Sequence, residues 1–274
     1  MSGIREAIGS GTIGSRLWFY TNYHCNLACS YCLTASAPDV PRRLLAPDRI
    51  LRIARDAPEL GFEAFGITGG EPLLARGVPD LTQRLAEIAP VVLLTNGTLF
   101  TPRMLRRVAG FARRDVAVQI SLDSAEEAVN DAGRGPGNHA KVVEAVPRLL
   151  AMGIRVRIAT TLAADADDDL TELCALHRAL GVPDEDHVVR PIVARGRALD
   201  DGIDAGEAEL FPELTLTADG AFYSPFAPTA LPGGGIDPTL KVADEVEPLA
   251  AAAAALADRV ARRATGADAL TGIR

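Results

Sequence analysis

Three cysteines, Cys25, Cys29 and Cys32, lie within eight positions of the segment TNYHCNLACSYCLTASAP, residues 21–38. Thiolates at this spacing can bind one metal centre from a single loop. A structural zinc site and an ordinary 4Fe–4S cluster both take four protein ligands, and this loop supplies three. Cys174 lies far along the chain, and His24 adjoins Cys25, where shared tetrahedral geometry is awkward. The pattern therefore favours an iron–sulfur cluster with one open iron over a zinc site or a plain structural role.

The elements that position these cysteines follow a repeating order, since short apolar runs alternate with helical patterns. Strands are predicted at 17–20, 62–68, 91–95, 116–123, 155–162 and 187–193. Helices are predicted at 47–61, 78–89, 101–112, 138–153 and 166–181. Strand followed by helix, repeated about six times, predicts a parallel α/β sheet with right-handed crossovers. The sheet is either an open doubly wound sheet or a barrel, and in both the chemistry collects where the strands end.

Further motifs follow the predicted strands in the order that such a site requires. Gly69-Gly70-Glu71-Pro72 follows the second strand, Thr95-Asn96-Gly97 the third, and SLDS (121–124) the fourth. Together with CNLACSYC and the segment at 133–153, these motifs resemble the radical S-adenosylmethionine superfamily, over roughly residues 15–198. The closest likeness is to the branch that carries SPASM or twitch extensions. The resemblance implies a partial (β/α)6 TIM-like barrel.

The resemblance also implies a cofactor set. Cys25, Cys29 and Cys32 would hold one 4Fe–4S cluster, and S-adenosylmethionine would bind its open iron. Reductive cleavage of that molecule gives a 5′-deoxyadenosyl radical, which abstracts a substrate hydrogen. A reducing partner such as flavodoxin or ferredoxin would supply the electron.

Nine residues are expected to bind S-adenosylmethionine on the strength of the resemblance. They are Tyr31, Gly69, Gly70, Glu71, Pro72, Asn96, Ser121, Asp123 and Arg134. Glycines at 69 and 70 would let the backbone approach the methionine, and Glu71 would accept from its ammonium group. Asp123 would bind the carboxylate or ribose, and Arg134 the carboxylate. Each has an ordinary alternative: a turn for the glycines and Asn96, a helix cap for Asp123, and a solvated loop charge for Arg134.

Beyond residue 198 the pattern changes, so we divide the chain into a core, 1–198, and a C-terminal extension, 199–274. LTLTADGAFYS (214–224) predicts a hairpin turning at Asp219-Gly220, and 240–264 predicts a helix interrupted or started near Pro248. Related SPASM hairpins place a cysteine where this chain has Ser224. With too few cysteines for an auxiliary cluster, the extension resembles a degenerate remnant. A redox-neutral reaction is therefore expected: rearrangement, elimination, epimerisation or carbon–carbon bond formation.

The sequence says least about the substrate. His24, His187, Arg190 and Arg195 are candidate substrate contacts. Arg190, Arg195 and Arg197 either bind a phosphate or carboxylate or pair with the acidic loop at 200–209. Cys174 is either a hydrogen-atom donor or a buried structural thiol. A small natural-product-type molecule is favoured over a ribosomally made peptide. An iron–sulfur carrier or scaffold without catalysis is the rival of another class.

Composition bounds the remaining possibilities. The net charge of −8 argues against general nucleic-acid binding, which relies on a basic face. The longest apolar run, LAAAAAALA, is too short to cross a bilayer, and no signal peptide is evident, so a cytoplasmic location is expected.

Overall fold

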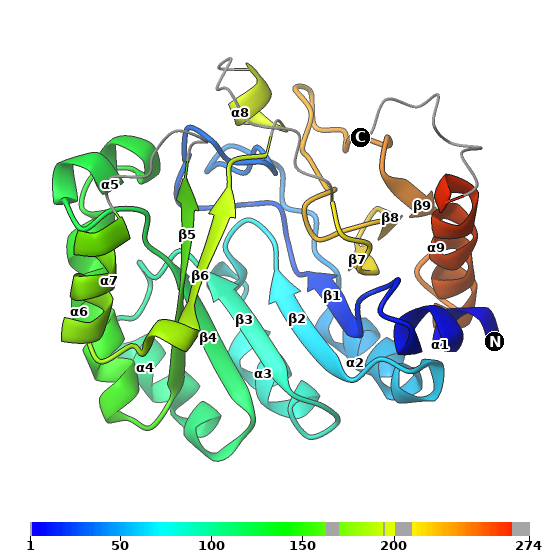
Figure 1. The fold of residues 1–274 in the computed structure, drawn as a ribbon, viewed down its shortest axis with the longest axis horizontal. Helices are drawn as coiled ribbons and strands as arrows, with labels where there is room; N and C mark the ends of the chain where they lie inside the picture. Colours follow the sequence, from blue (N-terminus) through cyan, green and yellow to red (C-terminus); the bar gives the residue numbers. More distant parts are fainter. Residues whose placement is uncertain (1, 163–169, 194, 201–209, 265–274) are drawn as a thin grey trace.

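The computed structural model describes residues 2–162, 170–193, 195–200 and 210–264. One nine-stranded sheet runs through it, in the order β6-β5-β4-β3-β2-β1-β7-β8-β9 (Figure 1). The strands are β1 Arg16–Tyr20, β2 Ala64–Thr68, β3 Val91–Thr95, β4 Val116–Ser121, β5 Arg155–Leu162, β6 His187–Pro191, β7 Thr215–Thr217, β8 Gly220–Phe222 and β9 Lys241–Ala243. Neighbours from β6 to β1, and β1 with β7, are parallel, whereas β7, β8 and β9 pair antiparallel. The first six strands form the expected partial TIM-like barrel.

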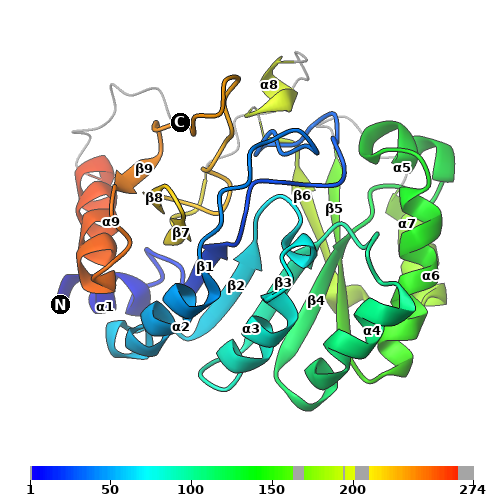
Figure 2. The same cartoon turned by 180° about the vertical axis from the view of Figure 1, so that it is seen from behind.

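Helices cover the outer face of this sheet, and α2, α3 and α4 lie in front of the strands when the molecule is seen from behind (Figure 2). The helices are α1 Ser2–Gly9, α2 Pro47–Asp56, α3 Val78–Leu85, α4 Pro102–Val108, α5 Glu127–Arg134, α6 Asn138–Ala151, α7 Leu170–Ala179, α8 Arg197–Asp200 and α9 Leu249–Ala264. Short 3-10 turns are η1 Pro58–Leu60, η2 Pro72–Leu74, η3 Ala109–Arg113 and η5 Asp184–Asp186. No described helix is long and apolar enough to cross a membrane.

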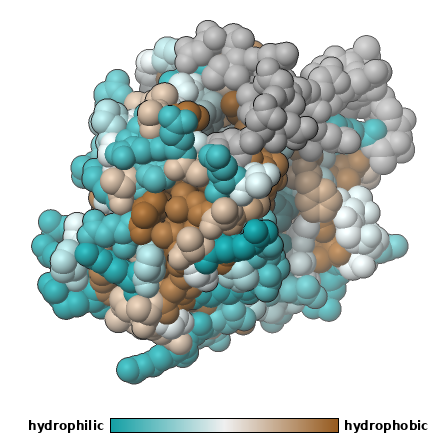
Figure 3. Space-filling view, turned by 60° about the vertical axis from the view of Figure 1, so that its left-hand side comes forward, coloured by the Kyte–Doolittle hydropathy of each residue, from teal (hydrophilic) through white to brown (hydrophobic). Residues whose placement is uncertain are grey.

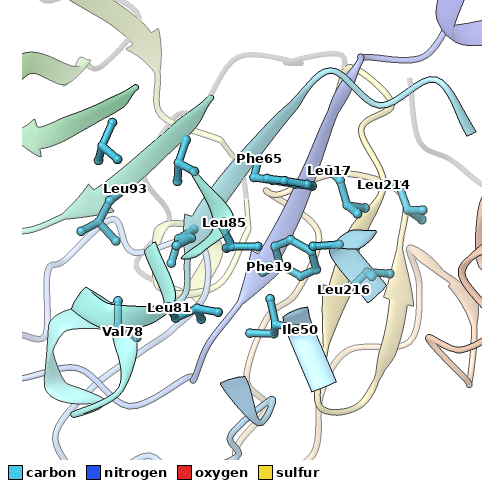
Figure 4. Packing of buried hydrophobic residues seen from close by; sticks show 14 of the residues in the cluster. Leu17, Phe19, Ile50, Phe65, Val78, Leu81, Leu85, Leu93, Leu214 and Leu216 are labelled. Carbon is cyan, nitrogen blue, oxygen red and sulfur yellow. The ribbon is translucent and has the colours of Figure 1, made fainter. Parts of the chain in front are cut away.

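The core lies between the sheet and the helices, because alternate strand side chains point to opposite faces. Leu17 and Phe19 of β1 point outward with Phe65 and Leu93, and meet Ile50 of α2 (Figure 4). The intervening residues of β1 face the interior of the barrel and line a cavity. The surface outside is mostly hydrophilic, with a compact apolar area near the middle of one face (Figure 3).

The helix expected at 47–61 is interrupted, and the cause is a proline. α2 begins with Pro47 in its first turn and ends at Asp56, because Pro58 has no N–H to continue the helical hydrogen bonds. Gly61, at φ 93°, then turns the chain into β2. The helix expected at 166–181 begins at Leu170 in the described chain, and residues 163–169 lie outside it.

The C-terminal segment continues the sheet. The hairpin at 214–224 is confirmed, although its two turn residues are Ala218 and Asp219, since Thr217 pairs with Gly220. The helix of 240–264 starts at Leu249, after Pro248, and residues 241–243 instead form β9 on the open edge of β8. α9 then packs beside α1 (Figure 1). The domain boundary at 198/199 stays a prediction.

Candidate functional site

The cysteine loop follows β1 and brings its three thiols to one cavity, as the sequence predicts. Cys25 is buried, Cys29 and Cys32 are partly buried, and none forms a disulfide. All three line a cavity of about 540 Å³ inside the barrel. Burial raises the pKa of Cys25 to about 12 and also raises the pKa of Cys29. The protonated form of these two thiols is therefore favoured, and a metal must displace their protons as it binds.

Segments distant in the sequence hold this loop in place. Nε of Arg197 donates to the carbonyl of Cys29 at 2.7 Å, its Nη2 to the carbonyl of Ser36 at 2.7 Å, and its backbone N–H to Cys32 O at 3.1 Å. Thr229 Oγ1 donates to the carbonyl of Leu33 at 2.9 Å. The prediction that Arg197 pairs with the acidic loop concerns residues 201–209, which lie outside the described chain. Its described partners are loop carbonyls.

Gly69 and Gly70 are required by the close approach of two backbone segments. A Cβ on Gly69 would lie 2.4 Å from Asn22 O, and one on Gly70 would lie 2.3 Å from His24 O. Gly70 N–H donates to Asn22 O at 2.9 Å, so the loop after β2 is fixed against the residues that precede Cys25. Both glycines also line the cavity. Any side chain here would displace the cysteine loop.

Glu71 serves a different purpose from the one expected. Its side chain is fully buried and lies outside the cavity lining. The carboxylate accepts from Thr95 Oγ1 at 2.9 and 3.0 Å, from Asn96 N–H at 2.8 Å and from Leu73 N–H at 2.9 Å. Burial raises the pKa of Glu71 to about 7, against the opposing effect of these donors. Glu71 thus links the loops after β2 and β3, and its oxygens are already occupied. Pro72 is also buried there, at the start of η2.

Asp123 and Arg134, both expected to contact S-adenosylmethionine, are paired with each other. Arg134 Nε donates to Asp123 Oδ2 at 2.6 Å and its Nη2 to Oδ1 at 3.1 Å, while Tyr31 donates its hydroxyl to the same carboxylate. Thr161 N–H also donates to Asp123, at 2.9 Å. Burial alone would lower the pKa of Arg134, but the carboxylate of Asp123 raises it. Tyr31 and Arg134 line the cavity next to Cys29.

Of the remaining predicted cofactor residues, Asn96 and Ser121 line the cavity. Asn96 Nδ2 lies 3.7 Å from Cys25 Sγ and donates to Asn26 Oδ1 at 3.0 Å. His24 does not line the cavity, and its buried Nδ1 has no hydrogen-bond partner among the described residues.

Cys174 and His187 lie on the wrong side of the sheet for the roles considered. Val188 and Arg190 of β6 line the cavity, so His187, one step before Val188 along the strand, points outward, toward α7. There its Nε2 lies 2.9 Å from Thr160 Oγ1 and its Nδ1 lies 3.7 Å from Cys174 Sγ. This placement favours the structural alternative for Cys174. His187 does not line the cavity, and its contact with substrate stays a prediction.

The two arginines considered for substrate binding are also separated. Arg190 lines the cavity, whereas Arg195 does not. Nη2 of Arg195 donates to Asp237 Oδ2 at 2.6 Å and to the carbonyl of Ala227 at 3.0 Å, in the C-terminal segment. Sequence reasoning missed many polar and aromatic residues of the cavity, among them Arg16, Trp18, Arg157 and Glu213. The alternation of Arg16, Trp18 and Tyr20 along the first strand was the available signal.

The described residues fit the cofactors that the motifs imply. Three free thiols face one cavity, and the Gly69-Gly70 backbone borders it without side chains. Among the described residues, no other group of His, Cys, Asp and Glu could hold a metal. Residues 20–176 match the family model described as "Radical SAM superfamily". The chain belongs to the radical S-adenosylmethionine superfamily, and it is an enzyme of the kind that uses a 4Fe–4S cluster and S-adenosylmethionine.

Curated relatives match the same region. GTP 3′,8-cyclase of Clostridium perfringens (strain SM101 / Type A) is 30% identical over 150 residues, which are 53% of this chain and 46% of that protein. Mycofactocin maturase MftC of Mycolicibacterium smegmatis is 34% identical over 161 residues, 58% of this chain and 40% of that protein. The matches thus span less than half of the length of these two relatives.

Solved structures share the fold. SuiB of Streptococcus suis bound to the precursor peptide SuiA superposes with a TM-score of 0.58 at 17% identity, over 69% of this chain and 42% of that one. anSMEcpe with bound AdoMet gives 0.54 at 19% identity, over 65% and 52%. At these identities the likeness concerns the fold alone.

Proposed function

We propose that the chain modifies a small natural-product-type molecule by hydrogen abstraction in a redox-neutral reaction. The observation that carries this proposal is the convergence of three free thiols and the backbone of two glycines on one cavity, whose other walls combine arginine, apolar and neutral polar residues. The cavity has the size of a small-molecule site. Modification of a ribosomally made peptide is the alternative, since SuiB, which shares the fold, binds a precursor peptide.

In this proposal Cys25, Cys29 and Cys32 hold the cluster and leave one iron open. When bound, the cluster and S-adenosylmethionine supply reductive cleavage to a 5′-deoxyadenosyl radical. The backbone at Gly69 and Gly70 lets the methionine end lie close to the cysteine loop. Tyr31 and Asn96 form the wall beside the cysteines, and the apolar walls exclude water.

For three residues we propose roles that differ from those the resemblance implies. Because Asp123 and Arg134 neutralise each other, we propose that they fix Tyr31 and the cysteine loop rather than bind the cofactor through free charges. Because the Glu71 carboxylate is saturated, we propose that this residue contributes through the backbone it fixes.

A redox-neutral outcome rests on the cysteine count. The chain has four cysteines, and after Cys32 only Cys174 remains, on the outer face of the sheet. An auxiliary cluster cannot be built from one thiol. The substrate radical therefore has no second cluster of this chain to accept its electron.

To test this, the cluster is reconstituted anaerobically with iron and sulfide, and dithionite and S-adenosylmethionine are then added. The amount of 5′-deoxyadenosine produced is measured. Cys29→Ala is expected to abolish the product, and Cys174→Ala, outside the cavity, is the matched cysteine control. A preparation with about four irons per chain that yields no 5′-deoxyadenosine would refute the proposal and favour the carrier or scaffold.

A further inference from the structure

Three arginines from three strands line the same cavity as the three cysteines. Arg16 opens β1, Arg157 belongs to β5 and Arg190 to β6, and all three line the cavity. The cysteine loop leaves β1 at its other end, after Tyr20. Four residue steps at about 3.3 Å separate the two ends of β1 by roughly 13 Å. We name this group of three arginines the arginine wall.

The positive charge of the arginine wall is only partly neutralised by its surroundings. Arg16 and Arg190 have no ion pair or hydrogen bond through their side chains among the described residues. Arg157 Nε lies 3.8 Å from Asp186 Oδ1, and that carboxylate is held at 2.6 Å by Arg155 on the other side. Glu213 is the only acidic residue lining the cavity in the described chain. Three guanidinium groups therefore face one carboxylate.

Burial makes this arrangement costly without a counter-ion. The pKa of Arg190 is lowered by burial and by the nearby charges of Arg157 and Arg16, with Glu213 opposing. Burial likewise lowers the pKa of Arg157. Like charges gathered in a partly desolvated cavity are typical of a site that binds an anion. A guanidinium presents a planar pair of donors that suits carboxylate and phosphate oxygens.

Apolar and aromatic side chains lie next to the arginine wall. The Arg16 guanidinium carbon lies 5.5 Å from the centre of the Trp18 ring, and that of Arg190 lies 5.4 Å from the Phe226 ring. Both rings also line the cavity, with Val92, Leu94 and Val188. A ligand that fits has a charged end and an apolar body.

We propose that the arginine wall binds the anionic group, a carboxylate or a phosphate, of a small substrate whose apolar body lies against Trp18 and Phe226. This inference rests on the proposed function and names the class of its substrate. Anchored by the arginine wall, the substrate would occupy the same cavity that the cysteine loop lines.

The test measures binding to the full-length, cluster-reconstituted protein by anaerobic calorimetry. The probes are 3-phenylpropionate, phenyl phosphate and the uncharged 3-phenylpropionamide. One of the two anions is expected to bind at least tenfold more tightly than the amide, and the tighter one identifies the anionic group. Arg157→Gln and Arg190→Gln are expected to weaken that binding at least tenfold. Arg103→Gln, an exposed arginine of α4, is the charge-matched control.

Two further measurements keep the test decisive. Trp18 is the only tryptophan of the chain, so its fluorescence in the cluster-free protein should change saturably as the anion binds. If a glutamine variant does not fold, as judged by circular dichroism, Arg190→Lys retains the charge and is expected to bind more weakly than the wild type because the planar donor pair is lost.

The inference is overturned if the amide binds as tightly as both anions, or if Arg103→Gln loses as much affinity as the two cavity variants. A protein that binds the anion but produces no 5′-deoxyadenosine supports the arginine wall and refutes the proposed function. A protein that produces 5′-deoxyadenosine but binds no probe refutes the arginine wall alone.

Discussion

The ion pair between Asp123 and Arg134 gives the sharpest stability prediction. The side chains are 13% and 6% exposed, and Asp123→Asn would leave the Arg134 guanidinium buried without a charge partner. Removing one member of a buried pair costs about 3–5 kcal/mol. Because Asp123 also accepts from Thr161 N–H and the Tyr31 hydroxyl, we expect a loss of at least about 3 kcal/mol in the free energy of unfolding.

An exposed ion pair of similar geometry supplies the control. Arg178 donates to both oxygens of Asp184 at 2.8 Å, but each side chain is 60% exposed. An exposed pair contributes at most about 1 kcal/mol, so Asp184→Asn should have a small effect. Urea unfolding of the cluster-free protein, followed by circular dichroism, measures both variants.

A double variant tests the cause. Asp123→Leu with Arg134→Met removes both charges, and it should be more stable than Asp123→Asn, since no buried charge is left alone. Equal losses for Asp123→Asn and Asp184→Asn would refute the reasoning, because they would show that burial of the pair does not matter.

Three further outcomes are expected. Burial, and then His187, lower the pKa of His177 to about 4 from 6.5, so unfolded chains bind a proton that the folded chain does not. The stability of the wild type relative to His177→Phe should therefore rise between pH 4 and 6.5, by up to about 3 kcal/mol in urea titrations, and a flat difference would contradict this. Gly70→Ala should prevent reconstitution, seen as lost iron and lost visible absorbance, whereas Gly9→Ala, which has open space around it, should reconstitute normally. Arg197→Gln should speed the loss of iron to a chelator several-fold, because it removes two donors to the cysteine loop, and an unchanged rate would rule out that clamp.

Local patterns predicted much of the fold. The strands at 91–95 and 155–162 have the observed bounds, because continuous apolar or strictly alternating runs leave little choice of element. The three thiols were predicted to converge because they lie on one short loop. The barrel of parallel strands follows from the alternation of elements, and the structure confirms it.

The features of the site that local patterns did not predict depend on contacts between distant segments. Nothing local shows that Arg16 and Arg157 face one cavity, since the inward face of each strand is decided only when the barrel closes. Asp123 and Arg134 were read separately as ligand contacts, although the loop between them brings the two charges together. The side of the sheet that His187 faces depends on the same closure, because one step along a strand exchanges the cavity for the outer face.

The contacts that hold the cysteine loop also set an order for its assembly. The carbonyl of Cys29 accepts a hydrogen bond from Arg197, which is synthesised 168 positions later. The carbonyl of Leu33 accepts one from Thr229, 196 positions later. At about 5–20 residues per second, a ribosome needs roughly 10 to 40 s to synthesise that stretch. During this interval the nascent chain carries three thiols whose final neighbours do not yet exist. Insertion of the cluster into its finished setting is therefore a late event, tied to completion of the C-terminal segment.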